Sequence, residues 1–419
     1  MTLTITPAKL KGPVTPPPSK SQAHRLLIAA ALAGGESVIH NVAYSADIEA
    51  TISCLEELGA AFRREGEALY VTGLAAGPMS PMGRMALPRL DCGESGSTLR
   101  FLIPVALAVR GGGIFTGHGR LMERPQGPYF DIFREKGIFF TQKEGALTVQ
   151  GRLTPGEYRL PGNVSSQFFT GLLLALPLLE GPSALISTTH LESEGYVQLT
   201  LQAMARFGVE GAMTMSLPPQ YHLPGGQSYT PAEVSVEADW SQAAFWYAAK
   251  GMGNQVDIIG MDPDSSQGDR EIERYYVKLK GAGEVDLDVS GCPDLVPPLA
   301  VMAAFRPGQV THLTNAARLR MKESDRLAAV REELCKLGAR VEEGPDFLTV
   351  TGVEHLPGGV RVDAHNDHRI AMMLAIAATR CEKPITLTRA ESVKKSYPNF
   401  WEDYVNLGGI IQPMKEETV

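Results

Sequence analysis

Six helix-like stretches along this chain each end in a glycine, and they recur at a nearly regular interval. The glycines are Gly59, Gly137, Gly208, Gly281, Gly338 and Gly408, so successive ones lie 78, 71, 73, 57 and 70 residues apart. A glycine after an apolar-periodic stretch is the usual left-handed cap of a helix. Six of them at this spacing indicate an internal repeat, which constrains the fold to an arrangement of six similar segments.

Each repeat reads as strand, helix, strand, helix, glycine and then a hairpin-like pair of short strands. In the first three repeats we expect helices over residues 25–33, 47–58, 98–109, 126–136, 167–179 and 196–207. The first helices of the last three repeats should start near Ser241, Leu295 and His368. The fourth repeat is short, since only about a dozen residues separate Gly281 from Asp294, and its closing hairpin is missing or merged.

The length of 419 residues is too great for one hydrophobic core, and the repeats divide into two domains of three. We predict a first domain over residues 14–225 and a second domain that combines residues 1–13 with residues 226–419. The Pro- and Gly-rich segment 217–228 is the expected crossover. In strand–helix–strand units the helix N-termini face the edge where the strands end, and their free N–H groups suit anions. A cleft between two such domains would gather many of these N-termini around one anionic ligand.

Composition excludes several classes of protein. The fractions of 44% hydrophobic and 21% charged residues are ordinary for a globular protein, and no apolar run approaches the ~20 residues of a membrane helix. There is no secretory signal pattern, and five scattered cysteines without a Cys-x-x-Cys favour a reducing cytoplasm without disulfides or a thiolate zinc site. A net charge of −8 argues against a nucleic-acid surface. We therefore expect a cytoplasmic protein without membrane or nucleic-acid partners.

Cationic residues of this acidic chain gather at the expected helix starts. Eight of them lie at or just inside such starts: Lys20, Arg25, Arg100, Arg124, Lys322, Arg326, Arg369 and Lys395. Cations in a first turn oppose the helix dipole, and an anionic ligand would reverse that penalty. Taken singly, each motif fits an ordinary capped helix, a tight turn or a solvated charged helix at least as well. Together they indicate a site for one or more polyanionic small molecules.

Two further features bear on the chemistry of this site. Segment 91–100 has two glycines and three hydroxyl residues before a helix, which suits a phosphate or carboxylate cradle, although it lacks the Gly-Lys-Ser/Thr of a Walker loop. Asp294 and Glu323 stand among the cations, and we expect the surrounding charge to hold them near a useful ionisation state for acid–base work. No metal-ligand spacing is present, so we expect no metal.

These motifs, in this order, resemble the EPSP synthase family, the 3-phosphoshikimate 1-carboxyvinyltransferases. The resemblance runs from about Lys11 to Pro413 and rests on Pro18-Ser-Lys20-Ser21 with Arg25, the Gly93-x-x-Gly96 turn ending in Arg100, Arg124-Pro125, Ser165-Ser166-Gln167, Ser193, Asp294, Lys322-Glu323-Ser-Asp-Arg326, Asp367-His368-Arg369 and Lys395. It implies an α/β protein with the two-domain enolpyruvyl transferase fold, an inside-out α/β barrel of six βαβαββ repeats with helices inside and sheets outside. That architecture agrees with the repeat count in the sequence.

The resemblance also implies an activity. Members of the family join phosphoenolpyruvate to the 5-hydroxyl of shikimate 3-phosphate through a tetrahedral intermediate and expel phosphate, on the shikimate pathway to chorismate and the aromatic amino acids. By resemblance, the residues that hold shikimate 3-phosphate are Lys20, Ser21, Arg25, Ser165, Ser166, Gln167, Ser193, Asp294 and Lys322, and those that hold phosphoenolpyruvate are Lys20, Gly96, Arg124, Gln167, Arg326, Arg369 and Lys395. Asp294 would accept the hydroxyl proton, while Glu323 and Lys20 would move protons to and from the methylene carbon. A monomer without metal or cofactor is the expected form.

The sequence departs from the family pattern at three places. Glu94 stands where the family often has asparagine, Arg318 stands where some members use asparagine to touch phosphoshikimate, and the fourth repeat is short before Asp294. Glyphosate competes with phosphoenolpyruvate in sensitive members of the family. Gly96, which has no Cβ, would leave room for that longer inhibitor.

Two alternatives stay open. The sister enzyme that transfers enolpyruvyl to UDP-N-acetylglucosamine shares the fold, but it usually carries lysine–asparagine where this chain has Lys20-Ser21. It also usually has a reactive cysteine in the loop that here reads Gly117-His-Gly-Arg-Leu-Met-Glu123. A catalytically silent repeat scaffold would leave the helix starts chemically arbitrary, whereas here they are cationic and hydroxyl-rich.

Overall fold

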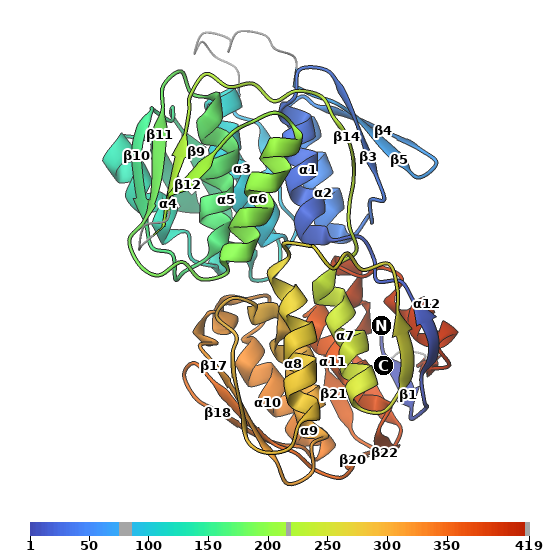
Figure 1. Cartoon of the computed structure of the whole chain (residues 1–419). Coiled ribbons are helices and arrows are strands. Elements are labelled where there is room, and N and C mark those ends of the chain that lie inside the picture. Colours follow the sequence, from blue (N-terminus) through green and yellow to red (C-terminus); the bar gives the residue numbers. More distant parts are fainter. Residues whose placement is uncertain (75–85, 215–218, 415–419) are drawn as a thin grey trace. The chain divides into compact units, whose positions relative to one another are not determined.

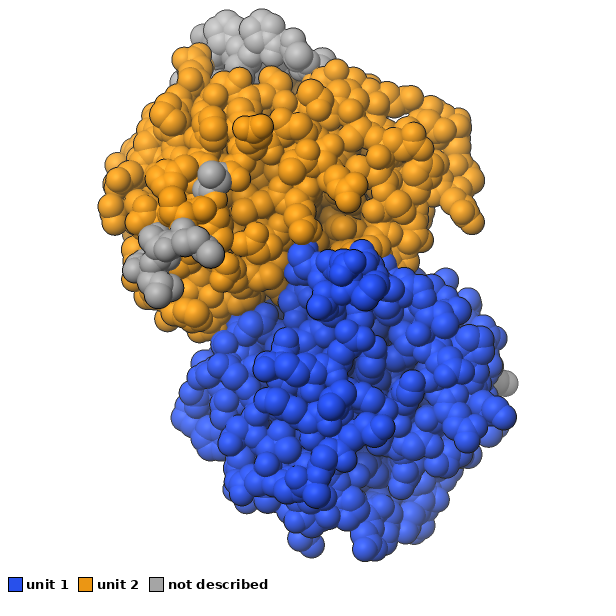
Figure 2. Space-filling model, viewed as in Figure 1, with its two compact units in different colours: residues 1–17, 238–419 blue, residues 18–237 orange. Residues whose placement is uncertain are grey.

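A computed structural model of the chain describes residues 1–74, 86–214 and 219–414, and the chain divides into two compact units. Unit 1 combines residues 1–17 with residues 238–419, and unit 2 comprises residues 18–237 (Figure 2). Within the described ranges, every helix is too short or too polar to cross a membrane. Each unit is built around its own hydrophobic core.

Unit 2 holds the first three repeats. Its helices are α1 (Lys20–Leu32), α2 (Ala46–Glu57), α3 (Gly96–Arg110), α4 (Gly127–Lys136), α5 (Ser166–Ala175) and α6 (Glu194–Arg206), with short 3-10 turns η1 (Leu121–Glu123) and η2 (Leu176–Leu178). Its strands are β3 (Glu36–His40), β4 (Ala61–Glu65), β5 (Ala68–Thr72), β6 (Arg89–Asp91), β7 (Gly112–Thr116), β8 (Phe139–Lys143), β9 (Ala146–Gln150), β10 (Gly156–Leu160), β11 (Ser183–Ser187), β12 (Ala212–Thr214), β13 (Gln220–Leu223) and β14 (Glu233–Ser235).

The three sheets of unit 2 share one topology. Their strand orders are β14-β3-β5-β4, β6-β7-β9-β8 and β10-β11-β13-β12. In each sheet the first two strands run parallel, and the second strand pairs antiparallel with one arm of a hairpin. The sheets lie around a central group of helices (Figure 1). This is the βαβαββ unit that the regular glycines indicate.

The first helix of each repeat is a core helix, and the second is amphipathic. In unit 2, α1, α3 and α5 are buried over most of their length, with Leu27, Leu102 and Leu173 inaccessible to solvent. By contrast, α2, α4 and α6 leave many residues exposed along one face. A helix that is apolar on all sides belongs in the interior of a domain, so the sequence itself places the first helices inside and the sheets outside.

Unit 1 holds the last three repeats together with the N-terminal strands. Its helices are α7 (Trp240–Gly251), α8 (Ile272–Lys280), α9 (Val296–Ala304), α10 (Arg326–Leu337), α11 (His368–Ala378) and α12 (Phe400–Asn406), with 3-10 turns η3 (Gly268–Glu271), η4 (Pro293–Leu295), η5 (Ala317–Met321) and η6 (Ala390–Lys395). Its strands are β1 (Leu3–Thr6), β2 (Lys11–Val14), β15 (Gln255–Ile258), β16 (Val285–Asp288), β17 (Val310–Thr314), β18 (Arg340–Glu343), β19 (Leu348–Thr351), β20 (Leu356–Gly358), β21 (Arg361–Asp363), β22 (Cys381–Lys383), β23 (Ile385–Thr388) and β24 (Ile410–Pro413).

The sheets of unit 1 repeat the same topology with one exception. The orders β16-β17-β19-β18 and β21-β23-β1-β24 match those of unit 2, and the N-terminal strand β1 completes the last sheet. The fourth repeat has only the parallel pair β15-β2. Between α8 and β16, a stretch that the structure describes in full, the chain forms no hairpin. Strands β20 and β22 form a further parallel pair.

The chain passes between the two units twice, and the strand before each passage pairs with a strand of the unit that the chain is leaving. Strand β2 precedes α1 in the chain but pairs with β15, whereas β14 precedes α7 but pairs with β3. The sequence placed the boundaries after residues 13 and 225; the observed divisions follow residues 17 and 237. Part of the expected crossover segment 217–228 forms strand β13. Residues 217 and 218 of that segment lie outside the described ranges.

Five of the six repeat glycines adopt the left-handed conformation at or just after their helices. Their φ angles are 104° at Gly59, 68° at Gly137, 74° at Gly208, 105° at Gly338 and 95° at Gly408. The prediction was wrong for Gly281, whose φ is −72° and ψ is 162°. The chain continues from α8 directly to β16 without a hairpin, and its backbone at Gly281 is therefore extended rather than left-handed.

Candidate active site

In unit 2, an ion pair and a set of hydroxyl groups link the starts of α1, α2 and α3. Ser19 caps α1, and Lys20 is the first residue of that helix. The Nζ atom of Lys20 donates to Oδ2 of Asp47, in the first turn of α2, at 2.7 Å. The hydroxyl of Thr98 lies 3.4 Å from the backbone oxygen of Asp47 and 2.7 Å from Oγ of Ser95, the cap of α3. These contacts bring Lys20 to the predicted anion cradle.

Gly96 and Arg124, two predicted phosphoenolpyruvate residues, are direct neighbours. Gly96 is the first residue of α3, and a Cβ added to it would lie 2.7 Å from Nη1 of Arg124. Arg124 follows η1 and is 8% exposed. The carboxylate of Glu94 lies against the backbone of Gly119, because a Cβ added to Gly119 would lie 2.6 Å from Oε2 of Glu94. The guanidinium of Arg124 therefore covers the backbone of Gly96.

Gln167 joins the start of α5 to the start of α3. Ser165 caps α5 by accepting a hydrogen bond from the amide of Gln167 at 3.3 Å. The side-chain amide of Gln167 donates to Oγ of Ser97 at 3.1 Å, and its oxygen accepts from Nη1 of Arg100 at 2.8 Å. Arg100 also donates to the backbone oxygen of Pro125 at 3.0 Å. The predicted cradle, Gln167 and the Arg124–Pro125 turn thus form one hydrogen-bonded group.

Arg25 lies in the second turn of α1 and is almost completely buried, with 2% of its surface exposed. Its guanidinium donates to the hydroxyl groups of Thr170 and Thr200 and to the backbone oxygens of Ser21 and Tyr196. Burial lowers the pKa of Arg25 to about 9, so the side chain is still a cation at neutral pH. The expected position in the first turn was wrong, because the helix begins at Lys20.

The remaining predicted residues of unit 2 are three serines at helix starts. Ser21 is the second residue of α1, and Ser166 is the first residue of α5. Ser193 holds the cap position of α6 with a left-handed φ of 56° and is 3% exposed. Serine at such positions supplies a hydroxyl next to free backbone N–H groups, which is a suitable arrangement for a phosphate.

In unit 1, Arg326 is a buried cation held by three carboxylates. It is the first residue of α10, and its side chain is 1% exposed. Its guanidinium donates to Asp367 at 2.9 Å, to Asp294 at 2.9 Å and to Glu323 at 2.6 Å. Burial alone would lower the pKa of Arg326, but the three carboxylates raise it above its ordinary value. This guanidinium is therefore a permanent charge.

Asp294 contacts three cations, and they decide its ionisation. It lies in η4 at the start of α9, with Arg326 at 2.9 Å, Arg369 at 3.0 Å and Lys322 at 3.4 Å. Burial raises the pKa of Asp294, but the charges of these three residues outweigh it and hold the pKa well below its ordinary value. The three cations thus keep Asp294 an ionised carboxylate, and its role in acid–base work stays a prediction. A carboxylate fixed by three cations is a weak base until they are engaged elsewhere.

Three of the eight predicted cations lie outside the α-helices, and Arg124, which follows η1, is one of them. Lys322 follows η5, and Lys395 is the last residue of η6. The Nζ atom of Lys395 donates to the backbone oxygen of Asn366 at 2.6 Å. Asp367, the next residue, caps α11 by accepting from the amide of Arg369 at 2.9 Å. Lys395, Arg369 and Arg326 thus share the short loop before α11, which is where three of the predicted phosphoenolpyruvate residues meet.

Sequence reasoning missed two carboxylates that organise these groups. Asp47 appears in the sequence as an ordinary acidic residue in a first helical turn, where it would favour the dipole. Asp367 stands in the quoted Asp-His-Arg motif but had no role assigned, although it is 0% exposed and binds Arg326. A fully buried carboxylate needs a cationic partner, but the burial of Asp367 is visible only in the structure and not in the motif.

Comparisons with known proteins agree on one family. The model of the family described as "EPSP synthase (3-phosphoshikimate 1-carboxyvinyltransferase)" matches residues 5–404. Proteins named 3-phosphoshikimate 1-carboxyvinyltransferase from Clostridioides difficile and Clostridium beijerinckii are each 43% identical to this chain, over 98% and 97% of it and 98% of their own lengths. A solved structure of EPSP synthase from Acinetobacter baumannii has a TM-score of 0.78 at 23% identity, and the match covers 98% of this chain and 100% of that one.

Proposed function

The chain belongs to the EPSP synthase (3-phosphoshikimate 1-carboxyvinyltransferase) family, and we propose that it transfers the enolpyruvyl group of phosphoenolpyruvate to the 5-hydroxyl of shikimate 3-phosphate, with release of phosphate. The observation that carries this proposal is the hydrogen-bonded network at the helix starts of each unit. In unit 2, Lys20 pairs with Asp47 and Arg124 lies against Gly96, and in unit 1 Asp294 pairs with Arg326 and Arg369. Both sets are the residue types that two polyanionic substrates require.

The reaction needs a group that removes the hydroxyl proton and groups that protonate and then deprotonate the methylene carbon. The 5-hydroxyl oxygen bonds to C2 of phosphoenolpyruvate while C3 gains a proton, which gives the tetrahedral intermediate. Phosphate then leaves as a proton is lost from the same carbon. We assign the first role to Asp294 and the second to Glu323 and Lys20. Arg326 contacts both carboxylates, at 2.9 and 2.6 Å, so an anion that binds it acts on both.

Substrate binding would change Asp294 from a weak base to an effective one. Its pKa is low because Arg369, Lys322 and Arg326 outweigh the effect of burial. When the phosphate and carboxylate of the substrates engage these cations, their field at Asp294 weakens, and burial then favours the protonated form. The carboxyl group would take the hydroxyl proton in the step in which the proton must move.

Unit 2 would supply most of the contacts to shikimate 3-phosphate. Ser21, Ser165, Ser166 and Ser193 offer hydroxyl groups at helix starts, and Gln167 adds a side-chain amide beside them. Arg25 would support this substrate site indirectly, because its guanidinium donates to hydroxyl groups and backbone oxygens of α1, α5 and α6 and so holds these helices together. The proposal includes a monomer in the cytoplasm, without metal or cofactor.

One assay tests the proposed function. Purified protein is incubated with phosphoenolpyruvate and shikimate 3-phosphate, and the release of inorganic phosphate is measured together with formation of the enolpyruvyl product. UDP-N-acetylglucosamine in place of shikimate 3-phosphate is the control for the sister reaction. Phosphate release only with shikimate 3-phosphate supports the proposal, and release only with the nucleotide sugar, or with neither, refutes it.

A further inference from the structure

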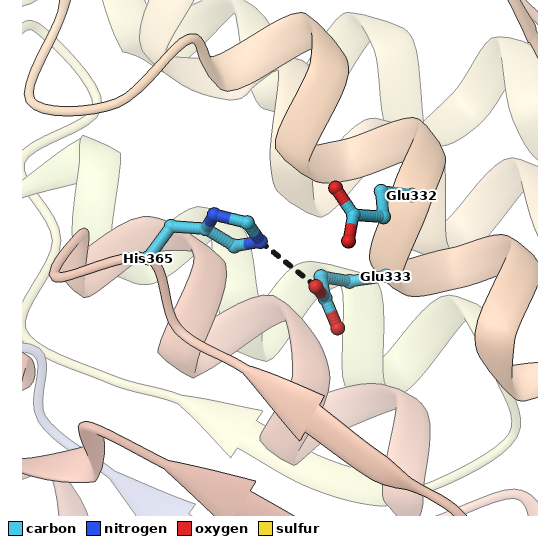
Figure 3. Close-up of side chains that lie close together, drawn as sticks. All are labelled: Glu332, Glu333 and His365. Atoms are coloured by element: carbon cyan, nitrogen blue, oxygen red, sulfur yellow. Dashed lines mark hydrogen bonds and ion pairs between the residues drawn. The ribbon is translucent and has the colours of Figure 1, made fainter.

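A group of acidic and basic side chains in unit 1 contacts the loop that leads into α11. Glu332 and Glu333 come from α10, and His365 follows β21 (Figure 3). Carboxylates and imidazole are also ligand types for a divalent metal. Here, however, Nζ of Lys336 lies 2.8 Å from an oxygen of each glutamate, so an ammonium group already supplies the cation that the two carboxylates need.

Glu333 is the centre of this group. Its side chain is 0% exposed, and one oxygen accepts from Nε2 of His365 at 2.8 Å and from Lys336 at 2.8 Å. Its other oxygen accepts from the backbone amide of Asp363 at 2.9 Å. Burial raises the pKa of Glu333, but these hydrogen bonds lower it below its ordinary value, so the group is an ionised carboxylate. Glu333 therefore fixes both the backbone and a side chain of the loop.

The loop that Glu333 holds has a strained backbone. His365 has a φ of 51° and Asn366 a φ of 53°, which are left-handed values at two successive residues that are not glycine. Such a conformation persists only where the surrounding structure imposes it. Besides Glu333, the side chain of Asp363 accepts from the amide of His365 at 2.7 Å and from Arg389 at 2.5 Å.

This conformation places three groups of the proposed site. The backbone oxygen of Asn366 points to Nζ of Lys395 at 2.6 Å. Asp367, the next residue, binds Arg326 and caps the helix that carries Arg369. A change of the backbone at His365 or Asn366 would therefore move the contacts of Arg326, Arg369 and Lys395, three of the five cations that are proposed for phosphoenolpyruvate.

We propose that Glu333 and His365 are positioning residues for phosphoenolpyruvate, which act by holding residues 363–367 in the left-handed conformation that this anion site requires. The inference rests on the proposed function. It assigns no proton transfer and no substrate contact to either side chain. Glu332 provides a matched control, because it is the adjacent residue and shares Lys336, yet within the described residues it forms no hydrogen bond to residues 363–367.

The contact between His365 and Glu333, and with it the support of residues 363–367, should depend on pH. The hydrogen bond to Glu333 raises the pKa of His365 above its ordinary value, against the effect of burial. The groups that face the imidazole are Glu332, Glu333 and Lys336 on α10 and Asp363 at the end of β21. Because the folded pKa is raised, the charge-assisted contact is complete at low pH and weakens as the pH rises through that pKa.

The first test compares Glu333→Gln, His365→Phe and Glu332→Gln in steady-state kinetics. We expect Glu333→Gln and His365→Phe to raise the KM for phosphoenolpyruvate by about tenfold while kcat changes little, as expected when a charged hydrogen bond that supports binding is lost. Glu332→Gln should leave both constants near those of the wild type. An unchanged KM in folded Glu333→Gln and His365→Phe overturns the proposal, and so does an equal effect in Glu332→Gln.

The second test separates the charge of His365 from its hydrogen bond. His365→Gln keeps a neutral donor at every pH, and its KM for phosphoenolpyruvate is divided by that of the wild type across a pH series. This ratio cancels the ionisation of the substrates. We expect it to exceed one at low pH and to approach one as the pH rises through the raised pKa of His365. A ratio that does not change with pH contradicts the role of the charge.

A third measurement does not depend on turnover. Hydrogen exchange of a peptide that spans residues 360–368 should be faster in Glu333→Gln than in the wild type and unchanged in Glu332→Gln, because the amide of Asp363 loses its carboxylate acceptor and the loop loses that support. If the wild type releases no phosphate but exchange responds as expected, the proposed function fails while the loop support stands. If exchange is unchanged in Glu333→Gln, the loop support itself fails. Urea unfolding of each variant identifies loss of the fold, and His365→Phe keeps the test open if Glu333→Gln does not fold.

Discussion

The two units hold their buried arginines in different ways. Arg25 in unit 2 is surrounded by hydroxyl groups and backbone oxygens, whereas Arg326 in unit 1 is bound by three carboxylates. Both guanidinium groups are nearly inaccessible. Neutral acceptors leave the positive charge of Arg25 uncompensated, while carboxylates cancel the charge of Arg326. The difference indicates a framework cation in unit 2 and, in unit 1, a cation for which a bound anion must compete with Asp294 and Glu323.

If the proposed site residues bind the substrates, the competition in unit 1 would couple substrate binding to proton uptake by Asp294. An anion that engages Arg326, Arg369 and Lys322 releases Asp294 from the charges that keep its pKa low. In the proposed mechanism, Asp294 would therefore become an effective base only when substrate is bound. Because Arg25 binds no carboxylate among the described residues, the same coupling does not operate through it.

Removal of the proton-transfer groups should have the largest effect. Asp294→Asn and Glu323→Gln keep the shape of each side chain but delete its basicity, so we expect turnover to fall by ~10²–10⁴-fold. Because the neutral amide of the Asp294→Asn variant would no longer compete for Arg326 and Arg369, the KM for phosphoenolpyruvate should stay unchanged or fall. Steady-state kinetics with both substrates measure this. Near-normal turnover in both variants would contradict the assigned roles.

The next largest effect concerns stability and tests the comparison directly. Arg326→Met should lower the free energy of unfolding by about 3–5 kcal/mol, because it leaves the fully buried carboxylate of Asp367 without its cation. Arg25→Met removes hydrogen bonds to neutral acceptors and should cost about 1–3 kcal/mol. Urea unfolding of the two variants supplies both numbers. Equal losses would mean that the charge of the acceptors does not distinguish the two sites.

A smaller effect is expected in the pH dependence of stability. The pKa of Asp294 is lower in the folded protein than in the unfolded chain, so the unfolded state binds more protons between these two values. This carboxylate therefore contributes stability above about pH 5, and that contribution is lost as the pH falls toward the folded pKa. Asp294→Asn should show a shallower loss of stability in acid than the wild type. Parallel curves in urea titrations at several pH values would disprove this link.

The sequence predicted the parts of the fold that depend on neighbouring residues. The start of α11 at His368 was predicted, and the repeat follows from the spacing of glycines. The expected starts at residues 25 and 98 were too late, because Ser19 and Ser95 cap helices that begin at Lys20 and Gly96. Pairing of β14 with β3 could not be foreseen, since it joins segments almost 200 residues apart and leaves no local pattern. Because β14 belongs to the sheet of β3, unit 2 extends to residue 237, beyond the expected crossover at residues 217–228.

The candidate site was predictable in its residue types but not in its charge state. The sequence gathered Asp294, Lys322 and Arg326 into one group, and the structure places them in contact. How far the pKa of Asp294 falls depends on distances to three cations and on burial, which no spacing reveals. Asp47 was missed for the same reason, because its partner Lys20 lies on a different helix.

The last and smallest effect concerns the anion cradle of unit 2 and the inhibitor glyphosate. A Cβ at Gly96 would lie 2.7 Å from Arg124, so Gly96→Ala must displace that guanidinium as well as fill space. Overpacking of this kind commonly costs about 1–3 kcal/mol. We expect a wild type that glyphosate inhibits and a Gly96→Ala variant that resists it, retains turnover and has a raised KM for phosphoenolpyruvate. In contrast to Asp294→Asn, the change should not alter the pH dependence of stability.

Glu94 provides the control for this last prediction, since it stands two residues before Gly96 and its carboxylate lies over the loop at Gly119. Its negative charge would weaken the binding of any anionic inhibitor, and Glu94→Asn should therefore increase sensitivity to glyphosate. Inhibition curves on the wild type, Gly96→Ala and Glu94→Asn separate steric from electrostatic effects. A wild type indifferent to millimolar glyphosate and unchanged by Gly96→Ala would refute the idea that the space above Gly96 admits the inhibitor.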